Sequence, residues 1–195
     1  DDATPGQVYV YVGTKTNTGN DIEKAGLANG NLYGVAVTGL TSEISLSVPT
    51  ANTAFTLASL GNVEALTGAT IQTNSVNAGV TAFLRPEDGA WDPSHPEDFY
   101  FATTNSFANP SRLWKLHFTD VKNPELGGTI TAVLDGTEGQ KMLDNLTIDN
   151  PLFKKIAYFI ANPTNNKSNN IKGITGENLI YNFFKNNFSH YSLED

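Results

Sequence analysis

Apolar and polar residues alternate along most of the first 150 residues of the chain. Alternation over stretches of about four to eight residues is typical of β-strands that bury one face. The pattern predicts strands at residues 7–13, 31–39, 98–104, 112–120, 128–136 and 146–149, with a further strand at 42–48. Gly, Pro and Asn in the connections mark turns. We therefore expect an all-β, antiparallel fold.

Two segments between these strands are less regular. Residues 14–30 are rich in Asn and Gly and too long for a tight hairpin, so we expect an excursion loop. Residues 64–75 are compatible with a short helix or with a loop, because their apolar residues show only weak periodicity.

The strand pattern recurs along the chain. VYVYVGT at residues 8–14 and DFYFATT at residues 98–104 are aromatic strands that end in small polar residues. Each is followed, after a loop, by a similar strand: LYGVAV at residues 32–37 and LWKLHF at residues 113–118. Repeated antiparallel units of this kind are typical of propeller blades. We expect residues 1–150 to form β-propeller-like blades, as a complete or an incomplete ring.

Blades of a propeller bury their faces against neighbouring blades. An incomplete ring exposes apolar faces and strand edges, which promote pairing with other chains. We therefore expect self-association, a partner chain over the exposed blade edges, or coverage of the exposed face by the tail of the chain.

Residues 151–195 differ in composition from the rest and form a divergent tail. Residues 1–150 carry 7 basic and 17 acidic residues, a net charge of −10, whereas residues 151–195 carry 5 basic and 3 acidic residues, a net charge of +2. The tail also contains nine Asn. We expect it to be irregular, with a strand or a short helix at residues 152–161 and an amphipathic helix or a final strand pair at residues 177–188.

Composition disfavours several classes of function. The formal net charge is −8, from 12 Lys and Arg against 20 Asp and Glu, which argues against nucleic-acid binding. No apolar run reaches the roughly 18 residues of a membrane span. The chain has no Cys, which permits an extracellular or periplasmic location. The first residues lack the pattern of a signal peptide, so we expect that one was removed or that the natural start lies elsewhere.

Six charged residues fall within residues 84–104, although only 16% of the chain is charged. Pro86 favours extended geometry at Arg85, and Gly89 permits a sharp reversal. Arg85 and Glu87 lie two positions apart, so on an extended segment they point to the same side. A guanidinium binds phosphate or carboxylate, and a carboxylate binds a hard cation. The pair therefore either holds a metal-bound oxyanion or forms a surface ion pair beside a turn.

A second polar cluster lies at residues 136–149. Asp144 and Asn145 precede the alternating LTID segment, and an adjacent Asp and Asn are good calcium ligands and equally good turn formers.

The segment DPSHP, at residues 92–96, is typical of a turn that Asp92 caps through its own backbone, with His95 exposed. The three His residues form no HxxxH or HExxH motif, which argues against a zinc hydrolase.

Together these motifs resemble the PhoX-type alkaline phosphatase family of secreted bacterial β-propeller proteins. The resemblance covers about residues 7–149, corresponding to the C-terminal half of the family domain, and rests on the first strand pair, FLRPEDGAWDP, FYFATT, SRLWKLHF and LDGTEGQKMLDNLTID. It implies a cluster of calcium and iron at the mouth of a propeller, which binds and activates a phosphomonoester. By this resemblance Arg85 would be the catalytic residue that contacts phosphate, Glu87 and Asp144 would ligate metal, and Asn145 would join Arg85 in substrate binding.

Two functions are compatible with these observations. The resemblance implies a secreted, metal-dependent phosphomonoesterase, or a portion of one, that takes a phosphate ester or another small anion. The alternative is a non-catalytic, propeller-derived module that binds a ligand, calcium or another chain. The iron site of the family uses a cysteine, which this chain lacks, and the resemblance ends before residues 151–195.

Overall fold

A computed structural model describes residues 6–43, 52–148 and 157–161 of the chain. Its elements, in chain order, are β1 (Tyr9–Val12), α1 (Asp21–Lys24), β2 (Asn31–Val37), β3 (Thr53–Gly61), α2 (Gly68–Asn77), β4 (Pro86–Asp92), β5 (His95–Thr103), β6 (Arg112–Phe118), the 3-10 helix η1 (Pro124–Leu126), β7 (Gly128–Leu134), β8 (Leu143–Ile148) and β9 (Ala157–Ala161). Most of the predicted strand at 42–48, and the tail beyond residue 161, lie outside the described residues.

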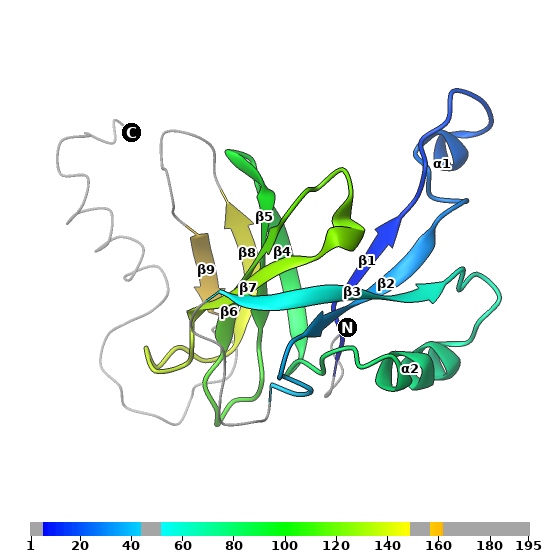
Figure 1. The fold of residues 1–195 in the computed structure, drawn as a ribbon. Coiled ribbons are helices and arrows are strands. Elements are labelled where there is room, and N and C mark those ends of the chain that lie inside the picture. The colour runs from blue at the N-terminus through cyan, green and yellow to red at the C-terminus, as the bar shows by residue number, and fades with distance from the viewer. Residues whose placement is uncertain (1–5, 44–51, 149–156, 162–195) are drawn as a thin grey trace, which may run out of the picture.

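Seven strands form one antiparallel sheet in the order β1-β2-β3-β7-β6-β5-β4, and β8 and β9 form a separate antiparallel pair. The large sheet curls strongly into a half-barrel (Figure 1). The prediction of an antiparallel β fold is confirmed in part, since the described residues are mostly β but include helices α1 and α2. The prediction of propeller blades is wrong, because blades are separate sheets and β1 to β7 form a single sheet.

Strand β3 is the reason for this difference. It pairs with β2 along one edge and with β7 along the other, where Phe55 lies opposite Gly128. It therefore joins the two strand groups that the sequence pattern reads as two blades. Short antiparallel strands have the same alternation in a blade and in a curled sheet, so only the order of pairing distinguishes the two folds.

The concave face of the half-barrel carries the main hydrophobic core. On β6, Trp114, Leu116 and Phe118 point to this face and are almost fully buried. Phe55 and Phe118 meet edge to face with ring centroids 5.3 Å apart. Burial of large side chains at roughly 25 cal/mol per Å² of apolar surface is the main force that holds such a sheet curled.

The segment before β4 closes one end of the half-barrel. Gly6 and Phe83 form an antiparallel bridge, with N–H···O distances of 2.9 and 2.7 Å, between the segments that lead into β1 and β4. Phe83 is fully buried and packs edge to face against Phe101 and Trp114. The two edge strands of the sheet are thus tied together at this end.

Helix α2 and the β8–β9 pair lie outside the main core. The Tyr9 and Ser75 hydroxyls are 2.9 Å apart, which links β1 to α2. Strand β8 packs against β4 and β5, and its Leu143 and Leu146 are buried. No helix in the described part of the chain is long and apolar enough to cross a membrane.

Some local predictions need correction. RPEDG does not form a reversal: its residues from Pro86 onward belong to β4, and the turn follows at residues 93–94. There Asp92 Oδ1 accepts hydrogen bonds from the backbone N–H groups of Ser94 and His95, as expected. Of the alternatives left open, residues 64–75 contain most of helix α2, and residues 152–161 contain strand β9.

Candidate functional site

Backbone strain concentrates at one end of strand β5. In the described part of the chain, the non-glycine residues with positive φ are Arg85 (58°), Asn105 (59°) and Met142 (55°). The Arg85 carbonyl accepts a 2.9 Å bond from the Thr104 N–H, and the Thr104 hydroxyl donates to the Leu143 carbonyl, next to Met142. Left-handed backbone is unfavourable for Arg and Met, whereas Asn tolerates it, and such strained positions cluster at functional sites. These five residues define what we call the β5 junction.

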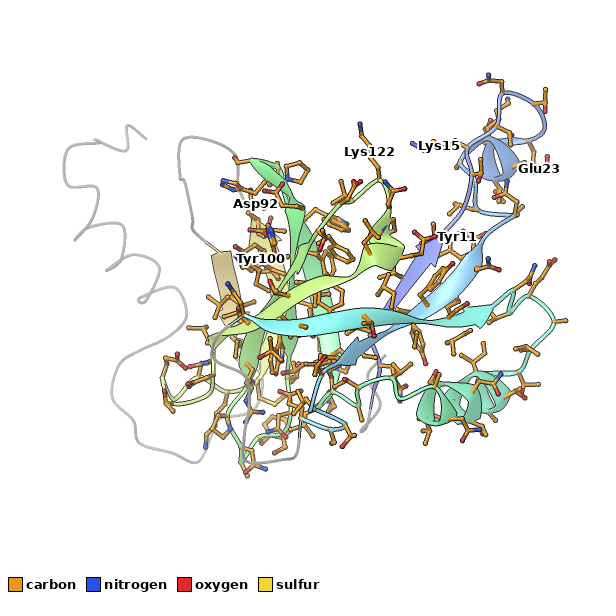
Figure 2. All side chains as sticks on the ribbon, viewed as in Figure 1. Tyr11, Lys15, Glu23, Asp92, Tyr100 and Lys122 are labelled. Atoms are coloured by element: carbon orange, nitrogen blue, oxygen red, sulfur yellow. The ribbon has the colours of Figure 1, made fainter. Side chains whose placement is uncertain are left out.

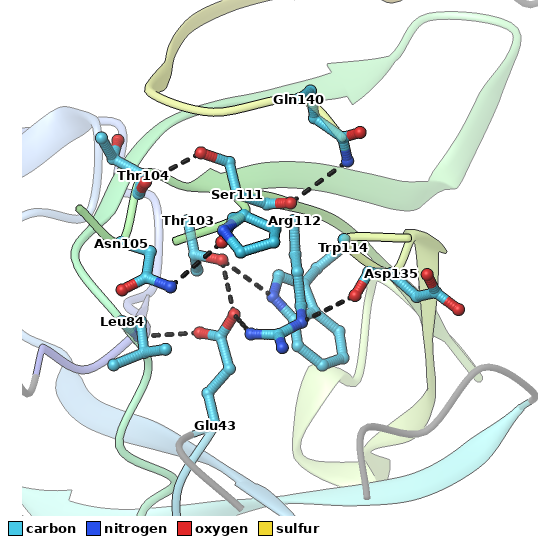
Figure 3. A network of polar contacts seen from close by, with 12 residues as sticks. Glu43, Leu84, Thr103, Thr104, Asn105, Ser111, Arg112, Trp114, Asp135 and Gln140 are labelled. Atoms are coloured by element: carbon cyan, nitrogen blue, oxygen red, sulfur yellow. Dashed lines mark hydrogen bonds and ion pairs between the residues drawn. The ribbon is translucent and has the colours of Figure 1, made fainter. Parts of the chain in front are cut away.

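A buried carboxylate organises the β5 junction (Figure 3). The Glu43 side chain is fully buried, and its Oε1 accepts from the Thr103 hydroxyl at 2.7 Å and from the Arg112 guanidinium at 2.9 Å. Its Oε2 accepts from the Leu84 N–H at 2.7 Å. Because Leu84 directly precedes Arg85, the Glu43 carboxylate holds the backbone next to a strained residue.

The network around Glu43 is closed. Arg112 Nε donates to the Asp135 carbonyl at 3.0 Å, and Trp114 Nε1 donates to the Thr103 hydroxyl at 3.3 Å. Among the described residues, every buried side-chain nitrogen or oxygen has a hydrogen-bond partner. A buried charge is costly unless it is paired and hydrogen-bonded, so this arrangement is stable only as a complete set.

Ser111 fastens the connection between β7 and β8 to the same region. Its hydroxyl donates to the Thr104 carbonyl at 2.8 Å and accepts from the Leu143 N–H at 3.0 Å. The side chain of Gln140 donates to the Ser111 carbonyl at 3.1 Å (Figure 3). These bonds bring the segment that carries Met142 against the end of β5.

Arg85 and Glu87 form a partly buried ion pair at the β5 junction. Arg85 Nη2 lies 3.4 Å from Glu87 Oε1, and the two side chains are 27% and 22% exposed. Arg85 Nη1 lies 3.5 Å from the Asn105 carbonyl. The two side chains meet, and the guanidinium is oriented by contacts on two of its nitrogens. The expectation of extended backbone at Arg85 is wrong, because its φ of 58° is left-handed and β4 begins only at Pro86.

The second predicted cluster lies on β8, which packs against β4. The direct link is made by Asp88, whose Oδ2 accepts from the Leu146 N–H at 3.1 Å. Asp144 is half-buried, and Asn145 is exposed at a shift in the β8–β9 register. The structure thus brings the strands of the two predicted clusters together through Asp88, a residue that no sequence motif singles out.

The donor set does not fit the resident metal cluster that the resemblance implies. Among the described residues, no group of three or more His, Asp or Glu side chains is placed to hold a metal ion. The chain also lacks the cysteine that the iron site of the family uses. Iron and a resident calcium cluster therefore have no support in the side chains that the structure places.

A polar cluster distinct from the β5 junction lies on the outer face of β5 and β6, opposite the core. Asp98 Oδ1 lies 2.6 Å from His117 Nδ1, and Asp98 Oδ2 lies 3.4 Å from Lys115 Nζ. Burial, followed by the charges of Asp98 and Asp92, raises the pKa of Tyr100 to about 12. Burial also raises the pKa of Asp92, but hydrogen bonds from Ser94 and His95 outweigh it, so the net shift is downward.

The sequence pattern does not indicate that the charged side chains around Glu43 and around Asp98 are buried. Glu43 lies in a segment where one acidic residue among Ser, Ile and Leu gives no sign of burial. Arg112 and Asp98 stand at the starts of predicted strands, where charged residues usually face solvent. The pattern of alternation does carry one signal, since it places Asp98 and Tyr100 on one face of a strand, and Lys115 and His117 on one face of the next.

The chain matches no family model, and no curated protein and no solved structure matches it.

Proposed function

We propose that this chain is a phosphatase-like binding module that takes a phosphate monoester, or a similar small oxyanion, at Arg85. The observation that carries the proposal is the Arg85–Glu87 pair, 3.4 Å apart and about a quarter exposed, at a point of backbone strain. A guanidinium with contacts on two of its nitrogens has a fixed orientation, and a planar guanidinium suits the bidentate recognition of a phosphate.

The acidic neighbours of Arg85 decide the form of the ligand. Glu87 and Asp88 repel a bare dianion, so we infer that the phosphate ester arrives with a hard cation such as calcium. A cation carried on phosphate oxygens needs only one or two protein carboxylates, and Glu87 supplies one of them. Weak calcium sites with dissociation constants of about 0.1–1 mM are filled outside cells, which accords with an extracellular or periplasmic location.

Binding, rather than hydrolysis by the chain alone, is the function that the donor set favours. Metal-ion catalysis of phosphoryl transfer relies on cations that the protein holds in place, and the described side chains form no group of three or more ligands for one. We infer that hydrolysis, where it occurs, requires ligands from a partner chain or another copy.

Calorimetric titration with phenyl phosphate tests the proposal, with and without calcium chloride. Arg85→Ala should weaken binding at least tenfold, because one bidentate charged contact is worth about 1.5–3 kcal/mol. Lys122→Ala is the matched control, since it removes one exposed positive charge from a loop and should leave binding unchanged. Equal affinity of the wild type and Arg85→Ala would overturn the proposal.

Hydrolysis of p-nitrophenyl phosphate in calcium, measured on the same proteins, separates the two functions. Equal, negligible rates for the wild type and Arg85→Ala fit a binding module. A wild-type rate that Arg85→Ala abolishes would show that the chain is itself a phosphomonoesterase and would refute the non-catalytic reading.

A further inference from the structure

The outer face of β5 and β6 carries four polar side chains in two adjacent cross-strand pairs. Asp98 lies opposite His117, and Tyr100 lies opposite Lys115. Neighbouring residues of this kind on one sheet face have Cβ atoms about 4.5–7 Å apart, so the four side chains form a compact square. Tyr100 lies near Asp92 beside the β4–β5 hairpin (Figure 2). This square is separate from the β5 junction, because its side chains point away from the core face that holds Trp114.

The carboxylate of Asp98 fixes the orientation of His117. Asp98 is only 11% exposed at its side chain, and its Oδ1 lies 2.6 Å from Nδ1 of the imidazole. In the neutral imidazole, a carboxylate at that distance favours the tautomer with the proton on Nδ1, which leaves the lone pair on Nε2. The His117 side chain is 47% exposed, so solvent and a small substrate can reach the imidazole.

Lys115 and Tyr100 carry hydrogen-bond donors on the same face of the sheet as this base. The Lys115 ammonium lies 3.4 Å from Asp98 Oδ2, which keeps its charge at the square. With a pKa raised to about 12, the Tyr100 hydroxyl keeps its proton at neutral pH and acts as a donor. A base next to a cation and a neutral hydroxyl is the arrangement that stabilises negative charge as it develops on a carbonyl oxygen.

We propose that the square formed by Asp98, Tyr100, Lys115 and His117 is a general-base site for the hydrolysis of small carboxylic esters. His117 Nε2 takes a proton from water as the water oxygen bonds to the ester carbonyl carbon. The carbonyl electron pair moves onto its oxygen, which Lys115 and Tyr100 stabilise. The tetrahedral intermediate then breaks its bond to the alcohol oxygen, which takes the proton from the imidazolium, and the products are an acid and an alcohol. Asp98 is a positioning residue in this scheme.

Hydrolysis of p-nitrophenyl acetate by the full chain tests the site. General-base catalysis contributes about 10²–10⁴-fold, so His117→Gln should lower kcat/KM at least tenfold. His95→Gln is the matched control: His95 also pairs with a carboxylate, Asp92, at 3.1 Å, but is more exposed and lies at the hairpin. Rates for His117→Gln within twofold of the wild type, or an equal loss for His95→Gln, would overturn the proposal.

Two further measurements test the role of Asp98. Nitrogen-15 NMR of the wild type should show His117 protonated on Nδ1 at pH 8, and Asp98→Asn should change the pH profile of kcat/KM as well as its height. A proton on Nε2 in the wild type, or an unchanged pH profile in a folded Asp98→Asn protein, would show that the carboxylate does not orient a base. A solvent deuterium isotope effect close to one would exclude water activation by His117.

Discussion

Removal of the Glu43 carboxylate is the most direct test of how this fold is held together. Glu43→Ala deletes the acceptor of three hydrogen bonds, from the Leu84 N–H, the Thr103 hydroxyl and the Arg112 guanidinium. It also leaves Arg112, only 18% exposed at its side chain, without its carboxylate partner. The variant therefore combines an orphaned backbone donor, an orphaned hydroxyl and an uncompensated, mostly buried charge.

The magnitude follows from these losses. Breaking a buried ion pair by removing one partner costs about 3–5 kcal/mol. Arg112 keeps its bond to the Asp135 carbonyl, so we expect the loss of stability to stay within this range. For a chain of this size each kcal/mol lowers Tm by about 2–4 °C, so we expect a loss of roughly 10 °C. Against a total stability of about 5–15 kcal/mol, this is a large fraction.

Urea denaturation followed by tryptophan fluorescence measures this cost, because Trp114 donates to Thr103 within the network. Glu64→Ala, at an exposed acidic residue, is the control and should change the free energy of unfolding by less than about 0.5 kcal/mol. Adding Arg112→Ala to Glu43→Ala should cost less than the sum of the single changes, because the two residues are coupled. A cost below about 1 kcal/mol for Glu43→Ala would refute the view that the network supports the fold.

Two other perturbations probe the outer face of the sheet. The folded pKa of Tyr100 is raised to about 12 from the ordinary 10.0, by burial and then by Asp98 and Asp92, so its contribution to stability is complete below pH 10 and is lost as pH rises through 12. Absorbance titration should therefore show a late tyrosinate transition that Tyr100→Phe removes, and its persistence in that variant would exclude the assignment. A Cβ at Gly34 would lie 2.3 Å from Val80 Cγ2, so Gly34→Ala should destabilise the chain by about 1–3 kcal/mol. Val80→Ala in the same chain should cancel part of this urea-measured loss, and strict additivity would contradict the packing described.

Most strands of this chain are predictable from sequence, but β3, β4 and the order of strands in the sheet are not. Alternation depends on one residue and its neighbours, and it locates the strands that carry Tyr9, Val35, Phe101 and Leu116. The order of strands in a sheet depends on which strand edges pair. In this chain β3 sets that order by pairing with both β2 and β7, and β3 lies in a Ser-, Thr- and Ala-rich region with weak alternation. Without β3 between β2 and β7, two groups of strands look like two blades.

The candidate site was also predictable from sequence only in part. The spacing of Arg85 and Glu87 suggests a contact on a shared strand face, but the contact forms with Arg85 in left-handed backbone, which the spacing does not indicate. Burial of Glu43 could not be predicted, since its partners lie 41 to 69 residues away in sequence. Local patterns describe neighbours along the chain, whereas a buried carboxylate is defined by segments that fold around it.

Replacing a buried ion pair by apolar side chains of similar volume often leaves a protein no less stable. The position of Glu43 explains why a charged pair, Glu43 with Arg112, occupies this site all the same. Apolar residues at 43 and 112 would leave the Leu84 N–H without an acceptor, and that N–H lies next to the left-handed Arg85. Strained residues cost on the order of 1–3 kcal/mol each and persist only where the surroundings over-determine them. The Glu43 carboxylate supplies this constraint to the one residue proposed to bind the oxyanion. Glu43→Gln, which keeps one acceptor oxygen and the side-chain volume, should therefore weaken phenyl phosphate binding even at temperatures where the protein is fully folded.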